Sequence, residues 1–151
     1  MDLEGIVDRV KKGFPESVLD VSTFRGETAL HLRAGDILPV CRFLHDDPDL
    51  AFDYLVDLCG VDHYPREPRF GVVYHLRSMR TRLPLRLKVS LPGESPLVSS
   101  VVSVWKGADW LEREAFDLLG ISFEGHPDLR RILLTPEWKG HPLRKDYPLR
   151  G

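Results

Sequence analysis

The C-terminal part of the chain carries four prolines, at positions 127, 136, 142 and 148. Because proline fixes its own φ angle and has no backbone N–H, neither a long helix nor an interior strand can run through them. The same segment is nevertheless rich in leucine, isoleucine and aromatic side chains, too many to remain in water. We therefore expect residues 121–151 to form an irregular but packed arm that lies against the rest of the chain or against another protein.

A helix is expected directly before this arm. Asp109 is a favourable N-cap residue, Glu112 stands where a capping box places an acid, and Gly120 can adopt the positive φ that ends a helix. Asp109 and Arg113 are four residues apart with the acid first, which favours a local ion pair. The arm is therefore expected to begin at the C-terminal end of a helix.

Two further acids on this helix, Glu114 and Asp117, lie three residues apart on one face and repel each other. Cations follow in the arm, because residues 125–151 hold six basic and three acidic residues, net +3, whereas the rest of the chain is net −5. We therefore expect Glu114 or Asp117 to pair with Arg130 or Arg131, which would lock the arm to the helix.

The remaining sequence predicts an α+β fold. Residues 83–91 alternate between apolar and polar side chains, as in a strand with one buried face. The chain length is that of one domain, with a compact body of residues 1–120 followed by the arm of residues 121–151. In order, the expected elements are a helix over 3–13, a hairpin of strands 18–24 and 28–33, a helix over 36–44, strands over 52–59, 69–78 and 83–91 with a turn-rich loop over 60–65, and a short helix over 97–105.

Composition and cysteine content limit the class of protein. The chain has a net charge of −2, and no apolar run approaches the roughly 20 residues that a membrane-spanning helix needs. Its first residues lack the apolar centre of a signal peptide, so we expect the chain to stay in the cytoplasm. Cys41 and Cys59 are too few for a disulfide framework or for the thiolates of an iron–sulfur cluster. Cys59, among apolar neighbours, is expected to be a buried thiol.

Histidines at positions 63, 126 and 141 raise the question of a metal site. No His-x-x-x-His or Cys-x-x-Cys pair accompanies them. We therefore expect His126 and His141, which lie in the Gly-His-Pro turns, to donate to backbone carbonyl groups instead. Glu112 and Glu114 point to different sides of a helix, which disfavours an acid–base pair. A nucleic-acid interface on the basic arm is also disfavoured, because a net charge of +3 is low for that role.

Three stretches of the sequence carry a resemblance to a known family. They are EREAFDLLGISF from residue 112, HPDLRRIL from residue 126 and GHPLRKDYPL from residue 140. With their charged residues at fixed spacing, they resemble the signature of the 30-kDa (C) subunit of respiratory complex I, the proton-translocating NADH–quinone oxidoreductase. Subunits of this type also occur in membrane-bound nickel–iron hydrogenases and formate hydrogenlyases, which are the alternative assemblies.

The resemblance implies a non-catalytic docking subunit that binds no cofactor itself. The NAD, FMN, iron–sulfur clusters and quinone would belong to other subunits of the complex. The expected position is the peripheral arm of the complex, on the cytoplasmic side of the cell membrane, with no membrane span of its own. The expected partners are chiefly the 49-kDa (D) subunit and the neighbouring iron–sulfur (B and I) subunits, and no nucleic acid.

Carried over residue by residue, the motif implies a partner interface and no catalytic, cofactor-binding or metal-binding residue in this chain. The implied interface residues are Glu112, Arg113, Glu114, Asp117, His126, Pro127, Arg130, Arg131, Gly140, His141, Pro142, Arg144, Lys145, Asp146 and Tyr147.

Overall fold

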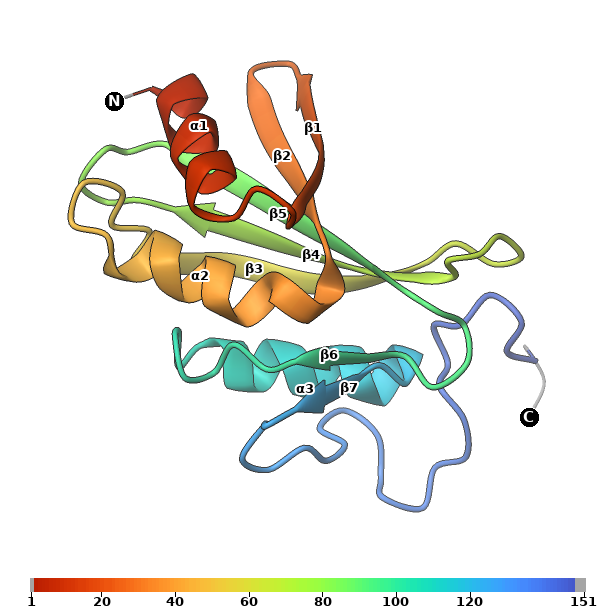
Figure 1. Ribbon diagram of the computed structural model, residues 1–151. Coiled ribbons are helices and arrows are strands. Elements are labelled where there is room, and N and C mark those ends of the chain that lie inside the picture. Colours follow the sequence, from red (N-terminus) through yellow and green to blue (C-terminus); the bar gives the residue numbers. More distant parts are fainter. Residues whose placement is uncertain (1, 149–151) are drawn as a thin grey trace.

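A five-stranded mixed sheet forms the centre of the fold (Figure 1). The computed structural model describes residues 2–148. Its strands lie in the order β1-β2-β5-β4-β3, so β1 and β3 are the two edges. All neighbours are antiparallel except β2 and β5, which pair in parallel. The strands are β1 Val18–Phe24, β2 Glu27–Leu32, β3 Tyr54–Asp62, β4 Phe70–Arg77 and β5 Pro84–Leu91.

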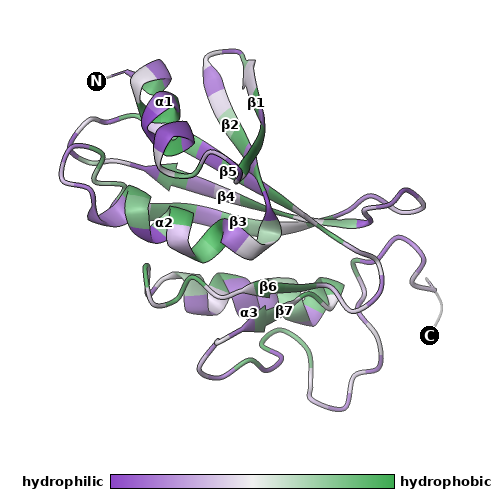
Figure 2. Cartoon of the chain, viewed as in Figure 1, coloured by the Kyte–Doolittle hydropathy of each residue, from purple (hydrophilic) through white to green (hydrophobic). Residues whose placement is uncertain are grey.

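Two helices, α1 Leu3–Gly13 and α2 Ile37–Asp46, cover one face of this sheet (Figure 1). A 3-10 turn, η1 Ala34–Asp36, leads into α2. Apolar and polar residues alternate along these elements, as amphipathic helices and half-buried strands require (Figure 2). In β5, the leucines and valine at positions 85, 87, 89 and 91 are all buried, whereas Lys88 is exposed. The predicted first helix, hairpin, second helix and three strands are confirmed, with boundaries shifted by a few residues.

The helix predicted over residues 97–105 is wrong. Residues Leu97–Ser99 form a short strand, β6, which pairs in parallel with β7, Ser122–Glu124. The apolar residues in this stretch are mostly valines, whose branched side chains favour a strand over a helix. Because β7 precedes the first proline of the arm, its backbone N–H groups remain available for this pairing. In the sequence, the third helix, α3, Ala108–Leu119, connects these two strands.

The loop predicted from residue 60 begins later than expected, because β3 continues to Asp62. Gly60 lies inside this strand, where a Cβ atom would stand 2.6 Å from Leu119 Cδ1 and 3.0 Å from Ile121 Cδ1. The glycine therefore marks a close approach of the α3 region to the sheet, and not a turn.

The prediction that Cys59 is buried is also wrong, since this thiol is exposed. Residues on a strand alternate between its two faces, and neighbouring Leu58 is the one that points into the core. Cys41, on α2, is the fully buried cysteine, and burial raises the pKa of its thiol.

Replacing Gly60 by alanine should lower the free energy of unfolding by about 1–3 kcal/mol, because the added methyl group overlaps buried side chains. Urea unfolding followed by circular dichroism measures the change. Gly13→Ala is the matched control, since a Cβ at Gly13 meets no atom within 4 Å. Equal stability of the two variants would contradict the close approach of Gly60 to Leu119.

Candidate partner-binding surface

The structure describes residues 121–148 of the C-terminal arm. After β7 the arm passes along the side of α3 that faces away from the five-stranded sheet, and it ends beside the loop between β3 and β4 (Figure 1). After β7 it contains turns and bends but no further helix or strand among the described residues. Its course is therefore set mainly by side-chain contacts with the body.

Asp117 is the central attachment point. Its carboxylate accepts hydrogen bonds from Arg131 Nη1 at 2.6 Å and from the backbone N–H groups of Ile132, Leu133 and Leu134 at 3.2, 2.8 and 2.9 Å. The predicted ion pair between helix and arm is thus confirmed for Asp117 and Arg131. Burial of the carboxyl group by itself raises its pKa, but these hydrogen bonds outweigh burial and leave the pKa of Asp117 below its usual value.

The second Gly-His-Pro turn caps the C-terminal end of α3. Helix ends leave their last carbonyl groups without partners inside the helix, and these groups carry the negative end of the helix dipole. The arm supplies donors to three of them: His141 Nδ1 to Asp117 O at 2.9 Å, the Leu143 N–H to Leu118 O at 2.9 Å, and Arg144 Nε to Leu119 O at 2.7 Å.

The first Gly-His-Pro turn holds the other end of the same helix. His126 Nδ1 accepts the backbone N–H of Asp128 at 2.9 Å, so its proton is on Nε2. Nε2 lies 3.0 Å from Asp109 Oδ1 and 3.3 Å from the Asp109 carbonyl oxygen. The prediction that His126 and His141 donate to backbone carbonyl groups is confirmed.

Two predictions for Asp109 are wrong for the same reason. The helix begins at Ala108, after Gly107 at the N-cap, so Asp109 already lies within the first turn and faces His126. Arg113 is therefore not paired with Asp109. Its guanidinium group instead donates to the carbonyl groups of two arm residues, Arg130 and Arg131, at 3.3 Å each.

The predicted capping role of Glu112 is wrong too. Glu112 follows Ala108 by one turn on the buried side of α3, and it is fully buried itself. Its carboxyl group accepts Ser100 Oγ–H at 2.6 Å and the Val101 N–H at 2.8 Å, which fastens the segment after β6 to the helix. Burial raises the pKa of Glu112, and the two hydrogen bonds only partly oppose this effect.

A fourth attachment point lies at the end of the arm and was not predicted from the sequence. Asp62, the last residue of β3, binds Arg69 Nε at 2.8 Å and the backbone N–H of Lys145 at 2.8 Å. Arg69 also pairs with Asp146 at 2.7 Å. Hydrogen bonding by Arg69 holds the pKa of Asp62 well below its usual value. Local spacing could not reveal this cluster, because its arm members Lys145 and Asp146 lie more than seventy residues after Asp62 and Arg69.

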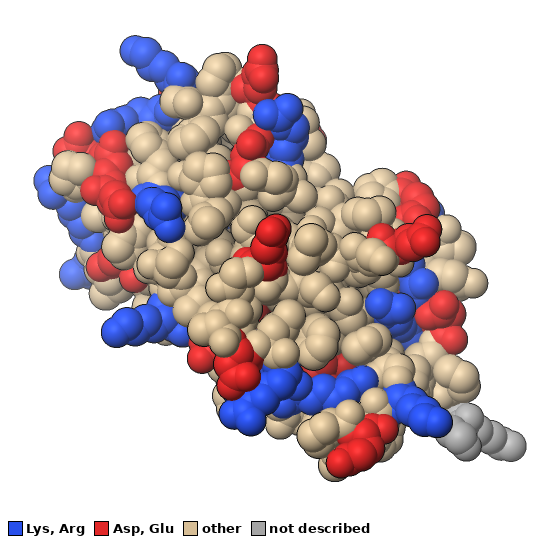
Figure 3. Space-filling view, turned by 60° about the horizontal axis from the view of Figure 1, so that its bottom comes forward, with Lys and Arg blue, Asp and Glu red and all other residues tan. Residues whose placement is uncertain are grey.

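These contacts leave large apolar side chains on the surface. Leu133, Trp138 and Leu143 on the arm are 55%, 44% and 59% exposed, and Trp110 on α3 is 55% exposed. On the side of the molecule that carries the arm, charged side chains form separate groups with broad uncharged surface between them (Figure 3). Exposed apolar residues framed by charge are typical of surfaces that bind another protein.

The fifteen interface residues implied by the motif occupy two kinds of position. The side chains of Glu112 and Asp117 are fully buried, so they can act on an interface only by positioning the arm. The side chain of His126 is also inaccessible. The other twelve are partly or fully exposed, and their contact with a partner stays a prediction.

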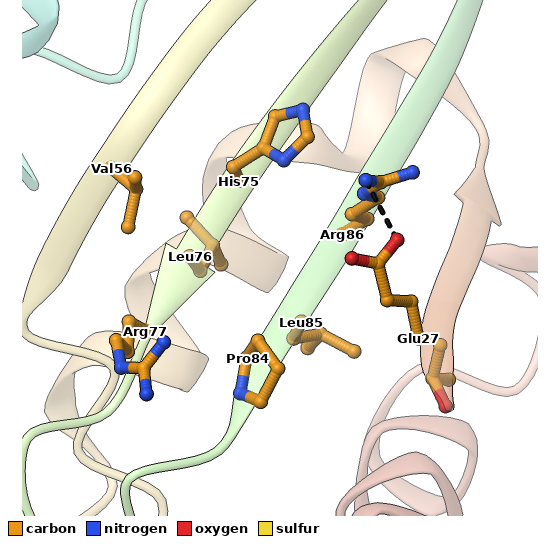
Figure 4. A pocket seen from close by; sticks show the side chains of 9 residues that line it. Glu27, Val56, His75, Leu76, Arg77, Pro84, Leu85 and Arg86 are labelled. Carbon is orange, nitrogen blue, oxygen red and sulfur yellow. Dashed lines mark ion pairs between the residues drawn. The ribbon is translucent and has the colours of Figure 1, made fainter. Parts of the chain in front are cut away.

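Another concave region lies on the sheet face opposite α2 and is bordered by His75 and by an Arg86–Glu27 ion pair of 2.7 Å (Figure 4). Burial and the nearby Arg86 lower the pKa of His75. Among residues 2–148, no group of three or more histidine, cysteine, aspartate or glutamate side chains could hold a metal ion. Within the same range, no helix is long and apolar enough to cross a membrane.

The sequence matches the family described as "Respiratory-chain NADH dehydrogenase, 30 Kd subunit" over residues 30–151. The chain belongs to this family. It is 47% identical to the C subunit of NADH-quinone oxidoreductase from Roseiflexus sp. (strain RS-1) over 99% of this chain and 86% of that protein. It is 45% identical to the corresponding C subunit from Geotalea uraniireducens (strain Rf4) over 96% of this chain and 87% of that protein. The resemblance identified from the three motifs is thus confirmed.

Two solved structures share the fold. The Nqo5 "trypsin-resistant fragment (1-134)" superposes with a TM-score of 0.70 at 31% identity, covering 85% of this chain and all of the fragment. A chain of the membrane-bound sulfane sulfur reductase, an archaeal respiratory membrane complex, superposes with a TM-score of 0.79 over 97% of this chain and 86% of that chain. At 23% identity the second match shows the fold alone. The family and the relatives identify the chain as a subunit of NADH–quinone oxidoreductase rather than of the hydrogenase-type assemblies.

Replacing Asp117 by asparagine should lower the free energy of unfolding at pH 7 by about 2–4 kcal/mol, because Arg131 and three N–H groups lose their buried carboxylate. Since the folded-state pKa of Asp117 is lowered, its contribution is present above the unfolded-state pKa of about 3.9 and is lost as the pH falls through the folded-state value. The variant should therefore lose less stability than the wild type on acidification.

Urea unfolding is measured at a series of pH values, from pH 7 down to the lowest pH at which the protein is folded. The series tests both the loss of stability at pH 7 and its dependence on pH. Asp8→Asn, on the exposed side of α1, is the control and should follow the wild type. Parallel pH curves for Asp117→Asn and the wild type would contradict the assigned role of the carboxylate.

Proposed function

We propose that this chain is a non-catalytic docking subunit of NADH–quinone oxidoreductase. In this proposal it lies in the peripheral part of the complex (its peripheral arm), on the cytoplasmic side of the membrane. Its partners in this proposal are chiefly the 49-kDa (D) subunit and the iron–sulfur (B and I) subunits. The reactions of NADH, flavin, iron–sulfur clusters and quinone are assigned to other subunits, and this chain supplies binding surface.

One observation carries the proposal: the arm is attached to the body at four polar sites, yet it leaves Leu133, Trp138 and Leu143 about half exposed to solvent. An arm that served only the stability of this chain would be expected to turn those side chains inward, because each buried leucine or tryptophan stabilises a fold by roughly 1.5–3 kcal/mol. Attachment through polar groups with apolar residues outward is the arrangement expected of a surface that a partner covers.

The proposal is tested by recovering the tagged chain from its native membranes in mild detergent. The expected result is co-purification of the 49-kDa and iron–sulfur subunits together with NADH–quinone activity. Recovery with a nickel–iron hydrogenase large subunit would assign the chain to the alternative assembly. Recovery of the chain alone would contradict a docking role.

Arg131→Ala should leave the sheet and helices folded but weaken incorporation into the complex, by roughly tenfold, because the arm loses its pair with Asp117 and its bond to Gly140 O at 2.7 Å. Circular dichroism of the isolated variant and native-gel quantification of the complex in membranes measure the two effects. Arg80→Ala, at an exposed loop position, is the control. Full incorporation of Arg131→Ala with unchanged activity would refute a role of the arm in docking.

A further inference from the structure

An apolar groove lies between the edge strand β3 and helix α3. It is bordered by Leu58 and Gly60 on the strand and by Ala115 and Leu118 on the helix, and Leu143 of the arm closes one side. Its open volume of about 180 Å³ is below the roughly 300–1,000 Å³ of small-molecule sites. The groove therefore fits one or two protein side chains better than a metabolite.

Two carboxylates stand at this groove without a cation. Asp57 on β3 and Glu114 on α3 both line it, and neither has an ion-pair partner among residues 2–148. Neighbouring basic side chains are engaged elsewhere: Arg86 pairs with Glu27, and Arg113 donates to arm carbonyl groups. The side chain of His75, opposite Asp57 on β4, has a lowered pKa, which disfavours its charged form. Of the two neighbouring acids on α3, Asp117 receives an arginine from the arm and Glu114 does not.

The outer side of α3 extends this surface. Trp110, Glu114 and Leu118 follow one another at intervals of four residues and so lie on one side of the helix. Trp110 is 55% exposed and Leu143, beside the groove, is 59% exposed. A partner that covered these apolar groups would also remove Glu114 from water, and a carboxylate buried without a cation is costly. The partner must therefore bring positive charge.

We propose that the groove between β3 and α3 binds a segment of another subunit in which an apolar side chain is flanked by lysine or arginine. The apolar side chain enters the groove beside Leu118 and Leu143, and the basic groups pair with Glu114 and Asp57. This proposal rests on the docking function proposed above and locates one part of that interface. The groove depends on the arm, because Leu143 is held by its N–H bond to Leu118 O at 2.9 Å.

The two cysteines of the chain provide a first test on the wild-type protein. Cys59 is exposed and lines the groove, whereas Cys41 is fully buried in the core. N-ethylmaleimide modification of each, followed by mass spectrometry of this chain's peptides, should proceed about tenfold more slowly at Cys59 in the intact complex than in the isolated chain. Cys41 should stay unmodified in both, which verifies that the chain is folded. Equal modification rates at Cys59 would overturn the proposal.

Charge reversal tests the chemistry of the occupant. Glu114→Lys and Asp57→Lys should each reduce recovery of the chain in the complex by about fivefold or more, because a like charge then faces the basic segment. Glu16→Lys makes the same change at an exposed site next to β1, at the opposite edge of the sheet, and should have no effect. If Glu114→Lys does not fold in isolation, Glu114→Gln replaces it, with an expected reduction of about two- to threefold.

A maleimide–benzophenone cross-linker attached at Cys59, whose photoreactive end inserts into C–H bonds of any residue type, identifies the occupant. A linked peptide from another subunit, with lysine or arginine beside an apolar residue, supports the proposal. A peptide from a second copy of this chain, or one without basic residues, overturns it. These outcomes are separable from the docking function itself. Absence of the wild-type chain from the complex refutes docking, whereas normal incorporation of the groove variants refutes only the groove.

Discussion

The buried carboxylate of Asp117 is the interaction on which the arrangement of the arm depends. This carboxylate accepts hydrogen bonds from one guanidinium group and from three consecutive backbone N–H groups. All of these donors belong to the arm, so the arm alone compensates the negative charge. Removing it would leave those donors buried and unsatisfied, which is costlier than the net gain from an ordinary hydrogen bond. The middle of the irregular segment, residues 131–134, is thus ordered around a single carboxylate and not by strand pairing.

The same helix organises the rest of the arm through its two ends. His126 binds near the first turn of α3, while His141, Leu143 and Arg144 satisfy the carbonyl groups of its last turn. The repeated Gly-His-Pro element is therefore used twice for one purpose, to fix an arm turn to a helix terminus. Prolines suit such a segment, because they limit the conformations of the unfolded chain and so reduce the entropy lost on ordering.

Polar groups of the arm form their hydrogen bonds with the body of the same chain, and this affects how the arm can bind a partner. The arm can keep its leucine and tryptophan side chains outward because its order does not depend on burying them. A surface that is already rigid loses less conformational entropy when a partner covers it. In the proposed docking role, this preorganisation is the physical contribution that a member of the 30-kDa subunit family makes to a complex.

The sequence by itself determined the elements with clear periodicity, the family, and the need of the α3 acids for an arginine from the arm. These rest on spacing within a few residues, where side-chain direction follows from local geometry. The tertiary structure decided that Glu112 is buried against Ser100, that Asp109 faces His126, that Cys59 is exposed, and that Asp62, Arg69 and Asp146 form one cluster. The exposure of Cys59 follows from the alternation of β3 around buried Leu58. Each of the others depends on which other segment packs beside a residue, and local spacing carries no information about that choice.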